Sequence, residues 1–340
     1  MYSVREVTKD VWWVGGHDHR LTLFENMHPI PRGVSYNAYL LFDKKSTILF
    51  DTAEWSACPQ LMENITYLLG KYGREKVDYL VVNHMECDHS SSVTTVLDKW
   101  APTIISTEKS FMLMRQFAYD PDDYNIDTVK EGDVRTFEDH TITFVEAPMV
   151  HWPEVMVTLD VTNGVLFSAD AFGSFIALDG KLFAKEVNYP RDWMDEARRY
   201  LTNIVGKYGP EVMYLVGKVL KLDLLPKIKY ICALHGLVWE AENFPYILDK
   251  YLHWATYTPE EKGVLLVYGS IYGNTESAAF ALASKIVEKG ITNIQVYDAS
   301  STHVSYLISE AFKFSHIVIC SPTYNLNILP PVHDFLEHMR

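Results

Sequence analysis

The stretch Asp78-Tyr-Leu-Val-Val-Asn-His-Met-Glu-Cys-Asp-His89 decides how this chain folds and what it binds. Its apolar first half predicts a buried strand, which leads into four metal-ligating side chains within six positions. His84, Glu86 and Asp88 alternate along the chain, so their side chains can converge on one point at a strand end or in a tight loop. His89 follows at the turn and can reach a second point nearby. One short loop can therefore serve two metal ions, which lie about 3.5–4 Å apart in two-metal sites.

Three further candidate ligands lie later in the sequence. His151, Asp170 and His235 each stand where an apolar, strand-like run gives way to a loop, the usual place for a rigidly held site. A carboxylate can bridge two cations, and Asp170 suits that role. A lone histidine after a strand is more often a capping or core residue than a ligand. We interpret the remaining histidines in that way: His17, His19, His28, His140, His253, His303, His316, His333 and His338.

The chemistry of the donor set favours iron. Four imidazoles and three carboxylates are available, and no thiolate is needed. Zinc sites often use more histidine or cysteine, whereas carboxylate-rich nitrogen and oxygen sets suit non-haem iron or manganese. Glu86 is the residue that favours iron over zinc. Two alternatives stay open, a zinc-dependent hydrolase that activates a water molecule and a non-catalytic electron carrier with a degenerate metal site.

The composition narrows the range of partners and compartments. The chain has 340 residues, enough for two or three domains, and a formal net charge of −14. An acidic surface repels nucleic-acid phosphates and anionic lipids, so we expect neither as a partner. No run of about 18 apolar residues predicts a membrane span, and the N-terminus lacks the pattern of a signal peptide. The four cysteines form no CxxC pair, which favours a reducing cytoplasm and excludes a rubredoxin-type iron site within the chain.

Two patterns of secondary structure divide the chain. Over residues 1–257, short β-rich runs alternate with a few helices, which predicts two sheets or a sandwich covered by helices. Residues 258–263 bring a proline and charges after a helix, and we interpret them as a linker. Over residues 264–340, strand, glycine-bearing turn and helix alternate, as in a doubly wound parallel sheet. We expect strands at 36–42, 46–51, 78–83, 103–106, 141–146, 264–268, 294–297 and 316–320, and helices at 61–72, 192–208, 243–257, 276–289 and 304–312.

Two loops of the C-terminal domain have the character of a flavin site. They consist of Ser270, Ile271, Tyr272, Gly273, Asn274 and Thr275, and of Ser321, Pro322, Thr323, Tyr324 and Asn325. Hydroxyls and backbone N–H groups at a helix N-terminus bind anions, and the first loop lacks the lysine of a Walker loop, so it suits a monophosphate. In a doubly wound sheet the ligand lies at the carboxyl ends of the first and third strands, where both loops are expected. A helix-capping turn and an ordinary proline-bearing loop are the alternative interpretation.

The metal-ligand pattern resembles that of the flavodiiron proteins, also called A-type flavoproteins. The likeness rests on His84-x-Glu86-x-Asp88-His89, on His151, Asp170 and His235, and on segments such as Ser35-Tyr-Asn-Ala-Tyr39 and His151-Trp-Pro-Glu154. The first flavin loop is similar to the FMN phosphate loop of flavodoxins. The resemblance extends over nearly the whole chain and implies a metallo-β-lactamase-like αβ/βα sandwich followed by a flavodoxin-like domain.

The resemblance also implies cofactors, an activity and partners. His84, Glu86 and His151 would bind one iron, Asp88, His89 and His235 the other, and Asp170 would bridge the two. Such proteins reduce dioxygen to water, nitric oxide to nitrous oxide, or both, with electrons that pass through FMN from a rubredoxin or a flavin reductase. They form a head-to-tail homodimer that brings the flavin of one subunit beside the iron of the other. The preference between the two gases depends on packing near His28, Trp152 and Phe172.

The sequence departs from this family at its end. Arg340 lies just inside the third helix of the flavodoxin-like domain, before two further strands and helices that carry a third flavin-contacting loop. If the protein ends at this residue, we expect the strand at 316–320 to be an exposed apolar edge, which is an aggregation hazard. We then expect FMN binding to be weak or absent, although the diiron site is complete.

Overall fold

The structure, a computed structural model, describes residues 1–117 and 119–340. The described chain forms two compact units, Met1–Ala197 with Pro210–Ile247, and Arg198–Gly209 with Leu248–Arg340. The second unit thus contains a segment from the middle of the chain as well as the C-terminal part. The linker that the sequence places at 258–263 remains a prediction.

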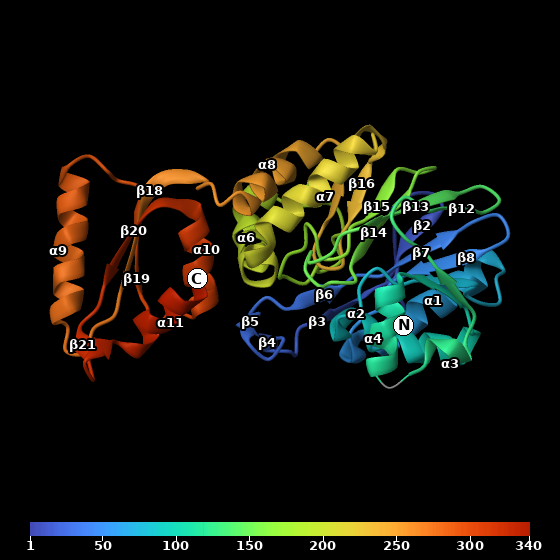
Figure 1. The fold of residues 1–340 in the computed structure, drawn as a ribbon, viewed down its shortest axis with the longest axis horizontal. Helices are drawn as coiled ribbons and strands as arrows, with labels where there is room; N and C mark the ends of the chain where they lie inside the picture. The colour runs from blue at the N-terminus through green and yellow to red at the C-terminus, as the bar shows by residue number, and fades with distance from the viewer. Residues whose placement is uncertain (118) are drawn as a thin grey trace. The chain divides into compact units, whose positions relative to one another are not determined.

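The first unit is built on two β-sheets (Figure 1). The first sheet has the order β1 (Arg5–Glu6), β2 (Val11–Trp13), β7 (Tyr39–Phe42), β8 (Thr47–Phe50), β9 (Tyr79–Val81), β10 (Thr103–Ser106) and β11 (Ile126–Thr128). The second has the order β12 (Val134–Thr136), β13 (Thr141–Glu146), β14 (Met156–Asp160), β15 (Val165–Phe167), β16 (Tyr230–Cys232) and β17 (Val238–Glu240). Two small ribbons pair β3 (Gly16–Asp18) with β6 (Val34–Tyr36), and β4 (Leu23–Phe24) with β5 (His28–Pro29).

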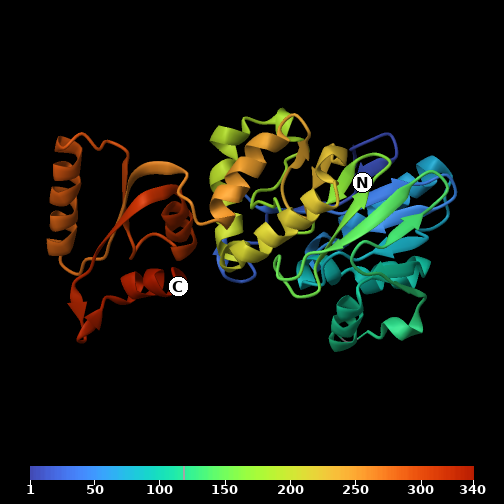
Figure 2. The same ribbon diagram turned by 45° about the horizontal axis from the view of Figure 1, so that its top comes forward.

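The two sheets pack face to face through large apolar side chains. Phe50 of β8 stacks on Phe167 of β15 with ring centroids 3.7 Å apart, and Tyr39 of β7 lies 5.5 Å from the same ring. Every residue of β7 and β8 is buried, because helices cover the outer face of this sheet as well. Figure 2 shows the sheets as neighbouring layers. Strands that are buried on both faces have continuous apolar sequences. This is why such strands can be predicted from the sequence.

Helices follow the strands throughout the first 257 residues. They are α1 (Cys58–Tyr72), α2 (Cys87–Ser90), α3 (Val93–Trp100), α4 (Glu108–Gln116), α5 (Tyr189–Asp192), α6 (Met194–Tyr200), α7 (Gly209–Lys221) and α8 (Phe244–Ala255), with short 3₁₀ turns at Trp55–Ala57, Pro121–Asp123, Ala184–Glu186, Gly206–Tyr208 and Leu225–Lys227. The apolar spacing of Leu61, Ile65 and Leu68 correctly predicts the buried face of α1, which begins three residues earlier than expected. None of the described helices is both long and apolar enough to cross a lipid bilayer.

Two predicted elements are interrupted. The single strand expected at 36–42 is wrong, because Asn37 separates β6 from β7 and donates from Nδ2 to the backbone oxygens of Ala233 and Gly236, both at 2.9 Å. The single helix expected at 192–208 is wrong too. It divides into α5, α6, a π-helical turn at Leu201–Val205 and a 3₁₀ turn.

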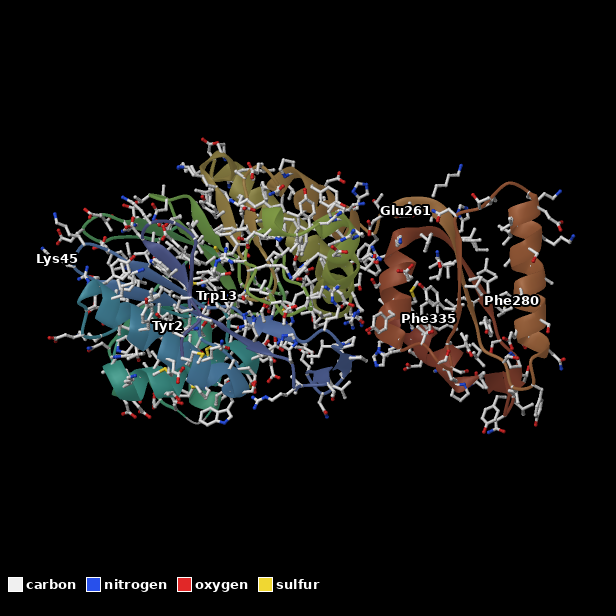
Figure 3. The ribbon with its side chains drawn as sticks, turned by 180° about the vertical axis from the view of Figure 1, so that it is seen from behind. Tyr2, Trp13, Lys45, Glu261, Phe280 and Phe335 are labelled. Carbon is white, nitrogen blue, oxygen red and sulfur yellow. The ribbon has the colours of Figure 1, made fainter. Side chains whose placement is uncertain are left out.

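The second unit contains a parallel sheet of three strands in the order β19-β18-β20. Its elements are β18 (Glu261–Tyr268), α9 (Asn274–Glu288), β19 (Ile294–Asp298), α10 (Val304–Lys313), β20 (Phe314–Cys320), the hairpin of β21 (Thr323–Tyr324) and β22 (Asn327–Ile328), and α11 (Pro330–His338). Alternate residues of β18 face opposite sides. Leu265 and Val267 pack with Phe335 of α11, whereas Leu266 packs against Ala279 of α9. Figure 3 labels Phe335 and, on α9, Phe280. The strand order agrees with the doubly wound arrangement predicted from the sequence, and β20 is an outer strand of the described sheet.

Candidate metal centre and flavin loops

The loop after β9 is fixed by a buried carboxylate. Asp51, which follows β8, accepts hydrogen bonds from the backbone and side-chain nitrogens of Asn83, both at 2.7 Å, and from the backbone N–H of His84 at 3.3 Å. The short helix α2 then starts directly after Glu86. The first part of the segment therefore projects from a strand end, and the remaining part projects from a helical turn.

The structure brings the first four predicted ligands together. Donor atoms of His84, Glu86, His151 and Asp170 all lie within 4.8 Å of one another, and we call these four residues the first cluster. Glu86 Oε2 is 3.3 Å from Nε2 of His84 and 2.9 Å from Nε2 of His151. Asp170 Oδ2 is 3.1 Å and 3.2 Å from the same two nitrogens. This is a tight arrangement of two imidazoles and two carboxylates.

The other three predicted ligands form a second cluster. Asp88, His89 and His235 also offer donor atoms within 4.8 Å of one another. Asp88 Oδ2 lies 3.2 Å from Nε2 of His89 and 3.0 Å from Nε2 of His235. Asp170 reaches this cluster with its other oxygen, because its Oδ1 is 3.4 Å from His89 and 3.7 Å from His235. One carboxylate therefore faces both clusters, one oxygen toward each.

The unsatisfied polar atoms show that these residues fit a pair of cations. Within the described part of the chain, both oxygens of Asp88, both oxygens of Asp170 and both ring nitrogens of His89 are buried and make no hydrogen bond. Potential partners lie within 3.7 Å, yet their directions do not suit a hydrogen bond. Buried polar atoms without partners are costly. Atoms aimed at a shared point rather than at each other suit metal ions, which would satisfy them.

The charges of the metal-free centre are strongly coupled. Burial opposes a charge on His89, but the neighbouring carboxylates of Asp88 and Asp170 outweigh it and raise the pKa of His89 to about 10. Burial likewise opposes a charge on His151, but Asp170 and Glu86 raise its pKa to about 9. Burial favours the neutral form of Glu86, yet hydrogen bonds from His151 and His84 lower its pKa to about 2. Since a metal needs neutral imidazoles, its binding displaces protons from this centre.

Outer hydrogen bonds orient two of the ligand rings. His84 Nδ1 lies 2.8 Å from Glu154 Oε1, and His235 Nδ1 lies 2.7 Å from the backbone oxygen of Ser35. Each ring thus turns Nε2 toward its cluster. The loop that carries His235 requires a glycine at position 236. Gly236 has a φ of +78°, and a Cβ there would lie 2.1 Å from Ser174 Oγ. Glu154 belongs to a segment that carries the family resemblance, but its pattern in the sequence does not predict its role as a hydrogen-bond partner.

Glu25 is a nearby residue that no sequence pattern marks. It lies in the turn between β4 and β5 with a φ of +50°; the residue as a whole is exposed, but its carboxyl group is desolvated beside that of Glu86. Burial and the charge of Glu86 raise the pKa of Glu25 to about 8. No motif surrounds it, and it lies 61 residues before Glu86, so only the fold brings the two together.

The three residues named for substrate preference lie at different places. The ring of Trp152 is 5.5 Å from that of His84. The ring of His28 is 6.0 Å from that of Phe175, and Phe172 packs 6.2 Å from Phe244. Trp152 thus has a ring contact with a predicted ligand. Phe24, which was not predicted, lies 5.3 Å from the ring of His235.

The two predicted flavin loops lie at one end of the second unit. Tyr268 pairs with Cys320 in the parallel register of β18 and β20, so the loops Ser270–Thr275 and Ser321–Asn325 leave the sheet side by side. Ser270 Oγ accepts a hydrogen bond from the backbone N–H of Gly273 at 3.0 Å, and α9 begins at the next residue. Ser321 Oγ accepts from the N–H of Leu329 at 3.1 Å. Exposed N–H groups at the start of a helix suit a phosphate.

Comparison with known proteins gives the family. A model described as "ODP family beta lactamase" matches residues 34–236. The anaerobic nitric oxide reductase flavorubredoxin of Vibrio vulnificus is 31% identical over 338 residues, which cover 98% of this chain and 66% of the relative. The rubredoxin-oxygen oxidoreductase of Megalodesulfovibrio gigas is 30% identical over 329 residues, with 96% and 79% covered. The chain belongs to the flavodiiron proteins.

Structural similarity agrees with this assignment. The solved rubredoxin oxygen:oxidoreductase from Desulfovibrio gigas aligns with a TM-score of 0.89 and 28% identity, over 99% of this chain and 82% of the other. The fold class predicted from the sequence, a metallo-β-lactamase-like sandwich with a flavodoxin-like sheet, is confirmed. Diiron and flavin are the cofactors of this flavodiiron family.

Proposed function

We propose that this flavodiiron chain reduces dioxygen, nitric oxide or both at a pair of iron ions held by the two clusters. The observation that carries the proposal is the placement of Asp170, whose two oxygens face separate triads of ligands. A shared carboxylate suits two cations a few ångströms apart. The names of two relatives, a nitric oxide reductase and a rubredoxin-oxygen oxidoreductase, support this chemistry over hydrolysis.

Each cluster would hold one iron. His84, Glu86 and His151 would bind the first, Asp88, His89 and His235 would bind the second, and Asp170 would bridge them. Bound iron supplies electrons and Lewis acidity to a small diatomic substrate. The chain itself fixes the ligands through the hydrogen bonds of Asp51, Glu154 and Ser35. Aromatic rings such as those of Trp152 and Phe24 flank the ligand histidines and help to exclude water.

The zinc-dependent hydrolase is the weaker alternative. Its support is the metallo-β-lactamase-like domain alone, and one fold carries many functions. Glu86 supplies a carboxylate to the first cluster, where a zinc site more often has histidine. Metal analysis of the purified protein separates the two: about two irons per chain support the oxidoreductase, and near-stoichiometric zinc without iron supports the hydrolase.

FMN binds at the two loops of the second unit in this proposal. Ser270, Thr275 and the backbone N–H groups at the start of α9 would hold the phosphate, and Thr323 and Tyr324 would contact the ring system. The support is the adjacency of both loops at the carboxyl ends of parallel strands. Retention of FMN through gel filtration, measured by its visible absorption, tests whether the 340-residue chain is sufficient.

A head-to-tail homodimer would bring each flavin next to the metals of the partner. The two loops and the β21–β22 hairpin that continues the second one expose apolar side chains that a partner can cover: Ile271, Tyr272, Tyr324, Leu326 and Ile328. Tyr272 is 91% exposed and Leu326 is 99% exposed, which is unusual for residues of this size. Light scattering should give a dimer mass. Leu326→Ser should weaken the dimer, whereas Leu282→Ser, at an exposed position on α9, should not.

The electron donor in this proposal is a rubredoxin or a flavin reductase, in the cytoplasm. The described cysteines are all free, which suits a reducing compartment. The test is anaerobic loading with ferrous iron, addition of reduced rubredoxin, and then addition of dioxygen or nitric oxide in separate assays. Consumption of either gas well above the free-flavin rate supports the proposal. Rates no higher than that background in both assays would overturn it.

A further inference from the structure

Glu154 is a buried carboxylate behind the first cluster. It is 1% exposed and lies between His151 and β14. Its Oε1 is 2.8 Å from Nδ1 of His84 and accepts the backbone N–H of Met85 at 2.9 Å. An ionised carboxylate can only accept, so His84 must donate from Nδ1. In the neutral ring this bond fixes the tautomer of His84, so that Nε2 can offer its lone pair to a cation that displaces the Nε2 proton.

No lysine or arginine of the described chain forms an ion pair with Glu154. His84 is its only described ion-pair partner, at 2.8 Å. Its second oxygen, Oε2, accepts no hydrogen bond from any described residue. A cavity of about 400 Å³ borders Glu154, but Lys109, which also lines it, donates instead to the backbone oxygen of Pro153 at 3.3 Å. The negative charge of Glu154 is therefore directed at the ring of His84.

The second cluster has a different outer partner. His235 Nδ1 faces the backbone oxygen of Ser35 at 2.7 Å, which is a neutral group. Asp51 is the other buried carboxylate close by, but its hydrogen bonds go to Asn83 and to the backbone of His84. The outer hydrogen-bond partner of His84 in the first cluster is thus a charged carboxylate. The outer partner of His235 in the second cluster is a neutral backbone carbonyl.

We propose that Glu154 is a positioning residue that makes the two irons unequal, so that the iron of the first cluster is the harder one to reduce. A carboxylate bonded to the outer nitrogen of a ligand histidine makes that ligand more basic. A more basic ligand stabilises the ferric ion over the ferrous ion and lowers the reduction potential. This inference rests on the proposed diiron function, and it adds an order in which the two metals gain electrons.

The decisive variant keeps the hydrogen bond and removes the charge. In Glu154→Gln the amide oxygen can still accept from His84 and Met85. We expect two irons to remain bound, while the lower of the two midpoint potentials rises toward the higher one. The amount of the mixed-valence state, followed by electron paramagnetic resonance during a redox titration, should fall. The matched control is Glu240→Gln, a buried glutamate of the same unit that pairs with Lys185 at 3.0 Å and should change neither potential.

A second variant separates orientation from charge. Glu154→Leu removes both the bond and the charge, so we expect the affinity for one metal to fall by roughly 10–100-fold, as is usual when an outer partner is lost. Titration with zinc measures this without any turnover. Glu154→Asp should recover part of the affinity.

The outcomes distinguish this inference from the function on which it rests. Unchanged potentials in Glu154→Gln, in a protein that still holds two irons and consumes gas, would overturn the inference and leave the proposed function intact. A wild-type protein that holds no iron pair would overturn both. A loss of thermal stability in the variants with no change in potential or metal affinity would show that Glu154 acts only in folding.

Discussion

The metal centre and the flavin loops differ in how much of each site the chain itself encloses. The ligands of both clusters have side chains no more than 16% exposed, and hydrogen bonds from outside the clusters orient His84 and His235. The flavin loops lie at an open sheet end, where Tyr272 is 91% exposed and Leu326, in the adjoining hairpin turn, is 99% exposed. A buried site shows its chemistry through charges that would be costly without a ligand. An exposed loop indicates its ligand only through the shape of its backbone. Whether the binding site is complete then depends on which other surface covers the loop.

The largest effect should come from the residue that joins the two clusters. Asp170→Asn leaves one oxygen and removes the charge, so each metal loses part of its ligand set. We expect both irons to be lost, with a fall in affinity beyond the roughly 100-fold that outer partners give, and gas consumption at background. Iron content by mass spectrometry checks this. The control is Asp160→Asn, a buried aspartate at the end of β14 that should keep both metals. Retention of two irons in Asp170→Asn would contradict a bridging role.

A change of metal preference should follow Glu86→His. The first cluster would then offer three imidazoles and one carboxylate, a set closer to that of zinc sites. We expect the protein to take up zinc in preference to iron at that cluster and to lose most of its reductase activity, while the fold persists. Competition between the two metals during refilling, followed by metal analysis, is the measurement. An unchanged iron-to-zinc ratio would show that Glu86 does not set the preference.

The pH dependence of stability should differ between metal-free and metal-filled protein. In the metal-free protein the pKa of His89 is raised to about 10 and that of His151 to about 9, against about 6.5 for an unfolded histidine. The native state therefore binds more protons than the unfolded state between about pH 6.5 and about pH 10. The free energy of unfolding should fall as pH rises from about 6.5 to about 10. Denaturant unfolding across this range checks the slope. With iron or zinc bound, the imidazoles are already neutral and this fall should disappear.

Gly236 gives a smaller effect, localised at the second cluster. Gly236→Ala places a Cβ against Ser174 in a backbone conformation that favours glycine, and should cost about 1–3 kcal/mol of unfolding free energy. It should also weaken metal binding, because the loop carries His235. In contrast, Gly217→Ala in α7 meets no atom within 4 Å and should stabilise by about 0.5–1 kcal/mol. Chemical denaturation measures the unfolding free energy of both variants. Equal changes in the two would contradict this prediction.

The smallest expected effect lies in the flavin loops. Ser270→Ala removes the bond to the N–H of Gly273 and one hydroxyl from the phosphate site, a loss of about 1 kcal/mol. FMN affinity should fall by about fivefold, measured by fluorescence quenching. Ser284→Ala, on an exposed face of α9, should leave it unchanged. Equal affinities for the two variants would favour the capping interpretation of this loop.

The sequence allowed the clusters to be predicted because residue type and spacing coincide there. Four candidate ligands in six positions after an apolar strand seldom occur without a metal to bind, and the structure brings all seven predicted ligands into two groups. The partners of those ligands could not be predicted in the same way. Glu25 lies close to Glu86 only because of the turn between β4 and β5. Ser35 orients His235 through its backbone oxygen, which every residue type has, so the sequence does not indicate this role.

The interrupted elements show the same limit. Residues 36–42 have a strand-like composition, but Asn37 bonds to backbone oxygens almost 200 residues later, and a local pattern does not contain that information. The segment 192–208 has a helical composition throughout, yet Arg198 is bonded to Ser309 and Glu310, and the helix changes to a π-helical turn nearby. Long-range contacts override local propensity in both places.

In the proposed centre, the short segment His84–His89 would serve one metal from its extended part and the other from the first turn of α2. Its length is therefore a constraint of its own. A single inserted or deleted residue between Glu86 and Asp88 would turn the helix by about 100° and misdirect Asp88 and His89 together. Substitution can change which metals bind, one ligand at a time, but a change of length would abolish the pair at once. During divergence this loop should accumulate exchanges and very few gaps, and an engineered transfer of the site to another scaffold would need to keep the strand end and the helix start in this register.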